Sequence, residues 1–275
     1  GNVHVAEGYE VQPLLRWGDG ITSSAPAFDV LNQSSASQSQ QFGYNCDYTA
    51  FLPLPAAKDG SQRGLLCVNH EYTDTTLMFP NIVDASSLEN LTKDQVDIEL
   101  AAHGHSVVEL QKHRGLWQVV RSSSFNRRIT ALDTVMKLTG PAAGHERLRT
   151  SADPTGTKVI GTLNNCAGGV TPWGTMLVCE ENFNNYFSGN PAKTPEERNH
   201  KRYGIKGPSE FSPAWAKHYL RFNIEQEPHE PNRFGWVVEF DPYDPASLPV
   251  KRTAMGRLKH EGAGIVVNGD GRVVI

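Results

Sequence analysis

The sequence contains few cysteines, and no two of them lie close together. Its 275 residues include four, Cys46, Cys67, Cys166 and Cys179, without the CxxC spacing that structural zinc sites use. The absence of this spacing argues against a structural zinc site. A chain of this length also does not depend on a disulfide framework. A disulfide between Cys46 and Cys67 stays open as an alternative if the protein is exported.

The sequence also lacks long apolar runs and an excess of positive charge. No apolar run is long enough to span a bilayer, and the mean hydropathy is −0.44. Lys and Arg number 26 against 30 Asp and Glu, so the net charge is −4 and gives no basic footprint for nucleic acid. We therefore expect neither a membrane span nor nucleic-acid binding, although local positive groups or metals can still bind small anions.

Helical periodicity is scarce, and no internal repeat such as a WD dipeptide is visible. Only residues 91–109 show helical spacing, with Thr92 as the expected N-cap. Most apolar residues fall in short runs between turn signals, which favours strands. The predicted strands are 8–21 (ending in a glycine turn), 46–54, 64–69, 117–121, 125–129, 219–223, 235–241, 252–258, 265–268 and 272–275. This pattern predicts an all-β protein with inserted loops and a short helical insertion.

Several stretches are expected to lie outside this framework of strands. Residues 25–41 and 150–163 are expected to be loops, and the polar segment 185–210 is expected to lie over the surface as an insertion. The last strand, 272–275, stops without a turn or polar tail, so we expect its partner further along the chain. We therefore predict one domain, residues 1–275, that is incomplete at its C-terminal end.

The segment with the most distinctive chemistry is residues 163–184, LNNCAGGVTPWGTMLVCEENFN. It places Cys166 beside Gly168 and Gly169 and ends a short apolar strand at Glu180 and Glu181. A thiolate binds transition metals strongly, whereas adjacent carboxylates suit hard cations such as Ca²⁺ or Fe³⁺. The segment therefore predicts a metal site with both kinds of donor; the alternative is a buried free cysteine above a strand that ends in solvated glutamates.

Two further glutamates lie where a strand is expected to meet a loop. Glu71 follows the predicted strand 64–69, and Glu261 follows the run TAMGRL. Loop ends on a rigid sheet can hold ligands to the tolerance that metal geometry requires. Any single glutamate is more often solvated than ligating, but the shared setting supports a joint site. The candidate metal donors are Glu71, Cys166, Glu180, Glu181 and Glu261.

Two other charged or histidine-rich motifs have simpler interpretations. His103 and His105 fall inside the predicted helix, where this spacing puts their side chains on different faces, so surface or supporting roles are favoured over metal binding. Arg127 and Arg128 are read first as a solvated pair, with bidentate phosphate binding as the alternative. No Ser or Thr has the surroundings expected of a nucleophile that forms a phosphoserine.

Five segments together resemble the PhoX-type alkaline phosphatase family. They keep the family's order and extend over nearly the whole chain. They are LLCVNHEYT at 65–73, FNRRIT at 125–130, residues 163–184, NRFGWVVEFDPYDP at 232–245 and GRLKHEGAG at 256–264. The resemblance implies a β-propeller that hydrolyses phosphate monoesters with a mixed centre of Fe³⁺ and Ca²⁺. It also implies export through the twin-arginine route to the periplasm or the extracellular space, with a signal upstream of Gly1.

The resemblance further assigns roles to individual residues. It makes Cys166 a ligand of the irons and Glu71 and Glu261 ligands of the metals, and these three are the predicted catalytic residues. Of the adjacent Glu180 and Glu181, the second is favoured as a ligand and the first stays open. The remaining ligands and a phosphate-contacting arginine would lie beyond Ile275, so the site needs the remainder of its own domain.

Supporting roles and rival functions complete the predictions. His70, Asn165 and Trp173 are expected beside the ligands, to orient them or shape the pocket, with turn formation and packing as their alternatives. Two rival functions keep the fold and the glutamates but use calcium only: a non-catalytic propeller, and an esterase or lactonase in which Cys166 is inert. Iron bound at Cys166 separates the phosphatase from both.

Overall fold

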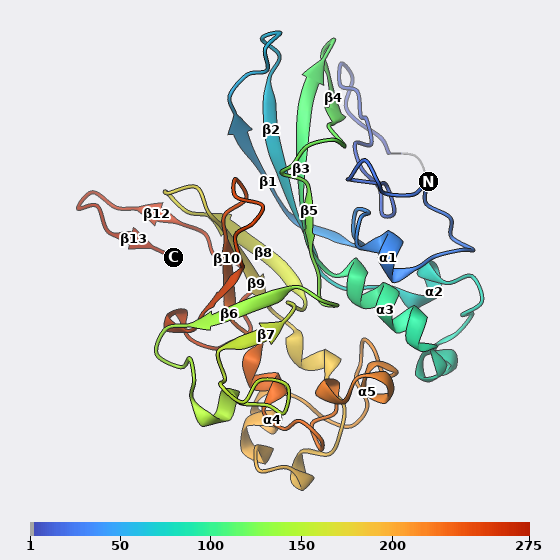
Figure 1. Ribbon diagram of the computed structural model, residues 1–275, viewed down its shortest axis with the longest axis vertical. Coiled ribbons are helices and arrows are strands. Elements are labelled where there is room, and N and C mark those ends of the chain that lie inside the picture. Colours follow the sequence, from blue (N-terminus) through green and yellow to red (C-terminus); the bar gives the residue numbers. More distant parts are fainter. Residues whose placement is uncertain (1–2) are drawn as a thin grey trace.

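The computed structural model describes residues 3–275, apart from the side chains of residues 85 and 86, and shows a mainly β protein. Residues 1 and 2, at the start of the predicted domain, lie outside the described residues. The first sheet occupies the upper part of Figure 1. Its order is β1 (Cys46–Leu54), β2 (Arg63–His70), β3 (Gly104–His113) and β4 (Leu116–Val119), with β5 (Arg127–Ile129) pairing with β3. All of these pairs are antiparallel.

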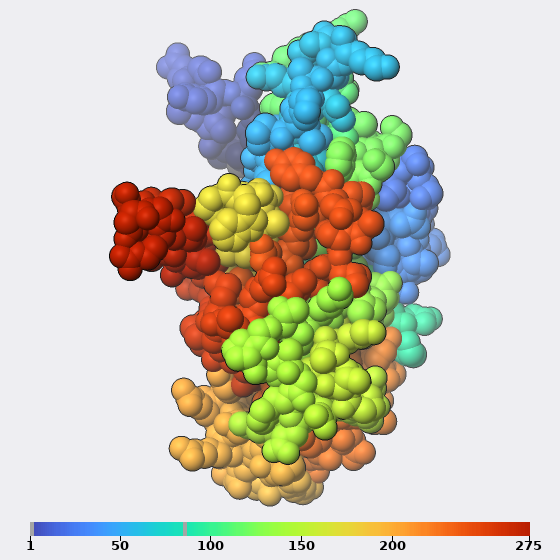
Figure 2. All heavy atoms as spheres, turned by 60° about the vertical axis from the view of Figure 1, so that its left-hand side comes forward, coloured from blue at the N-terminus to red at the C-terminus, as the bar shows by residue number. Residues whose placement is uncertain are grey.

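A second sheet of six strands lies in the middle of the molecule, and β8 packs beside β1 and β2 of the first sheet (Figure 1). Its parallel pair is β11 with β6, and its other pairs are antiparallel. A separate hairpin projects from the body at the C-terminal end (Figure 2). The strands, in sheet order, are β7 (Lys158–Ile160), β6 (Val135–Thr139), β11 (Val250–Arg252), β10 (Val237–Phe240), β9 (Met176–Glu180) and β8 (Asn165–Val170), and the hairpin is β12 (Val266–Val267) with β13 (Val273–Val274).

Short helices cover the sides and the lower end of the sheets (Figure 1). They are more numerous than the single predicted helix. The α-helices are α1 (Ser35–Gln38), α2 (Thr75–Met78), α3 (Lys93–Ala102), α4 (Glu197–Tyr203) and α5 (Trp215–His218). The 3₁₀ helices are η1 (Ala85–Asn90), η2 (Glu146–Leu148), η3 (Phe183–Tyr186), η4 (Pro191–Lys193), η5 (Leu220–Phe222), η6 (Glu230–Arg233) and η7 (Thr253–Met255).

The alternation of side chains along β2 and β3 separates two cores. Leu65, Cys67 and Val107 are buried in the main cluster, which also contains side chains of the second sheet. Val68 and Val108, one residue further along each strand, are buried in a smaller cluster with the N-terminal segment. Successive side chains of a strand point to opposite faces. Asn69 therefore faces the second sheet, and His70 faces the N-terminal segment.

The predicted helix over 91–109 begins where expected but ends much earlier. Thr92 caps α3 in a reciprocal arrangement with Gln95, yet the helix stops at Ala102. Gly104 has a φ of 104°, and a Cβ there would lie 2.0 Å from the Ile129 carbonyl oxygen, so the chain turns sharply into β3. His103 and His105 are therefore not on one helix, and both are buried rather than at the surface.

Other predictions fail where tertiary packing overrides the local pattern. The strand over 8–21 is absent among the described residues, 219–223 contains η5, and 252–258 contains the end of β11 and η7. β6 and β7 were not predicted, and β7 lies within an expected loop. The segment 185–210 is not simply a surface insertion, because Tyr186 and Phe187 are among its residues in the main core.

The arginine pair and the cysteines also have structural explanations. The Arg128 guanidinium donates to the carbonyl oxygens of Ala101 and His103 at 2.9 and 2.8 Å, and Arg127 donates to those of Asp241, Pro245 and Ser247. They are therefore neither a solvated pair nor a free phosphate fork. All four cysteines are free, so Cys46 and Cys67 form no disulfide. Among the described residues, no helix is both long and apolar enough to cross a membrane.

Glu99 on α3 makes the stability of the fold depend on pH. Its side chain is fully buried, accepts a hydrogen bond from Thr75 Oγ1, and accepts another from Trp215 Nε1 at 2.7 Å. Burial raises the pKa of Glu99 from 4.5 to about 7. Between these two values the folded state keeps a proton that the unfolded state releases, so the free energy of unfolding falls as pH rises, by about 3 kcal/mol in all.

The variant Glu99→Gln should lose this contribution, because its amide stays neutral and the Thr75 hydroxyl can accept as well as donate. Urea denaturation of both proteins between pH 4.5 and 8 measures it. The wild type should lose more stability than the variant across this window, and parallel curves would contradict the assignment.

Candidate metal centre

Three potential metal donors, each on a separate strand or directly after one, converge at one point. One ligand atom from each of Asp47, Glu71 and Cys166 lies within 4.8 Å of the other two. The Cys166 thiol lies 3.5 Å from Asp47 Oδ2, close enough to donate a weak hydrogen bond. Cys166 is buried, Glu71 is half-buried and Asp47 is exposed, so the group opens to the surface on one side. Two of the three, Glu71 and Cys166, are residues that the sequence predicted.

Irregularities in the sheets aim these side chains at one another. The pairing of β8 with β9 shifts between Asn165 and Gly168, which leaves Cys166 in a bulge. The pairing of β1 with β2 shifts between Cys46 and Thr49, which leaves Asp47 in a second bulge. Bulges bend a strand and redirect its side chains, and they are common next to functional sites. Two bulges and the end of β2, directly before Glu71, thus build the group.

The electrostatics of the group favour a bound cation. Burial, helped by the nearby carboxylates of Asp47 and Glu181, raises the pKa of Glu71 to about 7. Burial also raises the pKa of the Cys166 thiol to about 12, again helped by Asp47, Glu71 and Glu181. Crowded acidic groups hold their protons because their negative charges repel one another. A cation among them would remove this repulsion, so the donors present fit a metal ion.

Of the two adjacent glutamates, Glu181 is one whose charge acts on this group. Its charge contributes to the raised pKa values of both Glu71 and Cys166. Its backbone N–H donates to the Asn164 carbonyl oxygen at 3.0 Å, and the next residue, Asn182, donates to Asn164 Oδ1 at 2.6 Å. Asn164 adopts a positive φ of 50°, and these two hydrogen bonds tie the residue before β8 to the two residues after β9.

Glu180 has its carboxylate fully engaged elsewhere. Its side chain is completely buried, and Oε1 lies 2.7 Å from Lys251 Nζ. Oε2 accepts from the backbone N–H groups of Gly235 and Trp236 at 3.0 and 3.1 Å. Glu180 thus connects the end of β9 to β11 and to the two residues directly before β10, and both of its carboxylate oxygens already have partners.

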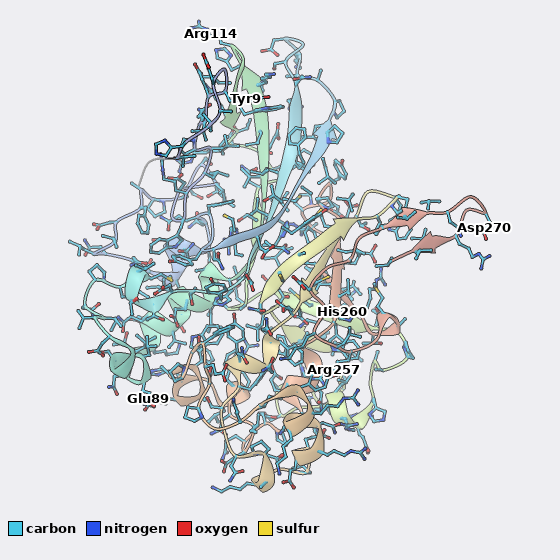
Figure 3. All side chains as sticks on the ribbon, turned by 180° about the vertical axis from the view of Figure 1, so that it is seen from behind. Tyr9, Glu89, Arg114, Arg257, His260 and Asp270 are labelled. Carbon is cyan, nitrogen blue, oxygen red and sulfur yellow. The ribbon has the colours of Figure 1, made fainter. Side chains whose placement is uncertain are left out.

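Glu261 is near the same strand but is not a member of the three-residue group. It is exposed, and it follows a loop rather than the predicted strand. The loop runs along β8, because a Cβ on Gly262 would lie 3.6 Å from Ala167 Cβ and Ala263 packs against Gly169. Figure 3 shows His260, the residue before Glu261, on the body of the molecule, whereas Asp270 projects at the tip of the C-terminal hairpin.

The three residues expected beside the ligands have different positions. His70 faces away from the group, since its Nε2 lies 2.7 Å from Ser106 Oγ and its ring packs against Phe42. Trp173 is exposed in the turn between β8 and β9 and donates to Glu239 at 3.0 Å. Asn165 lies next to Cys166 and donates to the Gly104 carbonyl oxygen at 3.1 Å, which ties β8 to the start of β3.

Sequence reasoning missed two residues of this site. Asp47 appeared only as one polar residue in a predicted strand, and nothing local indicated that it lies in a bulge. Asn69, the neighbour of His70, donates to the carbonyl oxygen of Cys166 at 2.5 Å. The only available signal was strand alternation, which puts Asn69 and His70 on opposite faces of β2.

A mainly β protein that gathers a thiol and carboxylates at strand ends and bulges has donors suited to a metal ion. Comparison with known proteins is more specific. The family model for alkaline phosphatase PhoX matches residues 1–275. The chain belongs to the PhoX alkaline phosphatase family.

A solved structure is also closely similar. It is PhoX from Pseudomonas fluorescens in complex with vanadate, a transition-state analogue, with 42% sequence identity and a TM-score of 0.88. The similarity covers 97% of this chain and 44% of that chain, so this chain spans less than half of its length. A comparison with curated proteins found no match.

Proposed function

We propose that this chain provides one part of the active site of an alkaline phosphatase that hydrolyses phosphate monoesters. The observation that carries the proposal is the convergence of Asp47, Glu71 and Cys166 at one point, with Glu181 adding its charge. Membership of the PhoX family supports it, and so does the similarity to a PhoX structure that holds a transition-state analogue. The complete domain is proposed to be a β-propeller, of which residues 1–275 form one part.

The proposed metals are Fe³⁺ and Ca²⁺. Cys166 and Glu71 are the proposed iron ligands, because a thiolate and a carboxylate together suit a transition metal. Asp47, Glu181 and Glu261 offer carboxylate oxygens, which suit Ca²⁺ as well. When bound, the cations would neutralise charge that develops on phosphate oxygens during phosphoryl transfer. Glu180 is excluded from the proposed ligand set because Lys251 and two backbone N–H groups occupy its carboxylate.

Metal loading of this site should release protons. The Cys166 thiol, with a pKa of about 12, and the Glu71 carboxyl, with a pKa of about 7, must both be ionised to act as ligands. Metal affinity should therefore rise with pH, in keeping with activity at alkaline pH. Export to the periplasm or the extracellular space is proposed from the family, as are phosphate monoesters as the substrates.

The test is the metal content of the purified full-length protein, measured by elemental analysis without added metal. We expect iron and calcium together, and hydrolysis of p-nitrophenyl phosphate that a chelator abolishes. Calcium without iron would contradict the phosphatase proposal and favour a calcium-only propeller, either non-catalytic or acting on carboxylic esters. Hydrolysis that persists after all metal has been removed would contradict the proposal that a metal centre carries the activity.

A further inference from the structure

The backbone of Cys166 is held from the neighbouring sheet by a side chain of β2. Asn69 Nδ2 donates to the carbonyl oxygen of Cys166 at 2.5 Å and to that of Ala167 at 3.2 Å. Neither residue has a register partner on β9, because the bulge interrupts the ladder at this point. Asn69 thus donates to two carbonyl groups of the bulge, and one of them belongs to the residue that carries the thiol.

The orientation of the Asn69 amide determines which hydrogen-bond partner its oxygen, Oδ1, requires. Two carbonyl oxygens occupy the Nδ2 side, so Oδ1 must point the other way, where His105 Nδ1 lies 2.7 Å from it. An amide oxygen can only accept, so His105 carries its hydrogen on Nδ1 and donates it. Its Nε2 is buried without a hydrogen-bond partner among the described residues. Burial, reinforced by the charges of Arg128 and Arg127, lowers the pKa of His105 well below its usual value, so the ring is neutral.

The two side chains are direct neighbours on the face of the first sheet that meets β8. Asn69 and His105 are opposite residues in the antiparallel pairing of β2 with β3, and both are fully buried. A polar pair at such a position costs free energy unless its hydrogen bonds are complete. Without a donor from residue 105, Oδ1 of Asn69 would be unsatisfied, and a rotated amide would direct its oxygen at the carbonyl oxygens of Cys166 and Ala167.

We infer that Asn69 and His105 are positioning residues for the metal centre. His105 orients the Asn69 amide, and the amide holds the bulge in the geometry that directs the Cys166 thiol toward Asp47 and Glu71. This inference rests on the proposed function, because it assigns a purpose to the hydrogen bonds only if Cys166 is a metal ligand. Mutation of residues that orient a metal ligand without binding the metal typically lowers metal affinity by about 10- to 100-fold.

The test uses two replacements of nearly equal size, His105→Leu and His105→Asn, in the metal-free full-length protein. Both remove the ring that packs edge-on against Phe240 at 4.9 Å between centroids. Only His105→Asn keeps a donor at the position of Nδ1. Co²⁺ alone serves as the probe, because a thiolate bound to Co²⁺ gives a charge-transfer band in the near ultraviolet. Thermal denaturation of each metal-free protein measures the structural effect separately.

We expect His105→Leu to weaken Co²⁺ binding about 10- to 100-fold and to reduce the charge-transfer band, as befits a residue that orients a ligand. His105→Asn should bind Co²⁺ within a few fold of the wild type, even though it loses the same ring contact. If the two variants bind Co²⁺ equally, whether both strongly or both weakly, the inference is overturned. If the wild type shows no thiolate band at all, the proposed metal centre fails, and the inference fails with it.

Discussion

The variant Cys166→Ser should lose its iron and nearly all of its phosphatase activity. A hydroxyl is a far weaker iron ligand than a thiolate, and Cys166 provides the only sulfur atom of the three-residue group. Bound metal contributes several kcal/mol to the stabilisation of a phosphoryl-transfer transition state, so a loss of roughly a thousandfold in kcat/KM is expected. Elemental analysis and hydrolysis of p-nitrophenyl phosphate by the purified variant measure the two effects.

A matched control separates ligation from burial. Cys179 is also free and buried, and burial raises the pKa of its thiol to about 12 as well, but it packs in a separate apolar cluster with Leu177 and Val237. Cys179→Ser should therefore keep its iron, although it buries a hydroxyl at some cost in stability. Equal iron content in Cys166→Ser and the wild type would show that the thiol is not a ligand, whatever the control does.

Local sequence patterns predicted the parts of the site that depend on one strand alone. The predicted strand 46–54 has the same bounds as β1, and the predicted strand 64–69 is one residue shorter than β2 at each end. Glu71 therefore follows its strand as expected. Cys166 was singled out because a thiol and an acidic pair, Glu180 and Glu181, fall within the same short segment.

The remaining parts depend on how strands pair, which the local pattern does not contain. A bulge at Asp47 exists only because β1 shifts its register against β2, and the residues of β1 look like any exposed strand. Local sequence patterns could not decide between Glu180 and Glu181 as the metal ligand for the same reason. Consecutive residues of a strand point to opposite faces, and only the position of Lys251, some 70 residues later in the chain, shows which face is buried.

The second large effect is a loss of stability expected when the ion pair of Glu180 with Lys251 is broken. Both side chains are fully buried, and Lys251 Nζ also donates to the Arg233 carbonyl oxygen at 3.0 Å and lies over the Phe234 ring. Lys251→Met would leave the Glu180 carboxylate without its counter-charge in the core. Such a change costs about 3–5 kcal/mol, a large part of the stability of an ordinary domain. Urea denaturation should show this loss.

An exposed ion pair provides the control for this variant. Lys201 lies 2.6 Å from Glu197 on α4, one turn away, with both side chains largely in solvent. Lys201→Ala should cost no more than about 0.5 kcal/mol, since solvent screens such pairs. If Lys251→Met is as mild as Lys201→Ala, the buried pair does not carry the charge assigned to it.

The double variant Glu180→Gln with Lys251→Met connects this stability effect to the metal centre. Removing both charges leaves no uncompensated carboxylate, so most of the stability lost in Lys251→Met should return. Because the carboxylate of Glu180 is occupied by Lys251, Gly235 and Trp236, the double variant should also keep its iron and calcium. Glu181→Gln, in contrast, should lose metal while its metal-free form stays as stable as the wild type. A folded double variant that has lost its metal would show that Glu180, rather than Glu181, is the ligand.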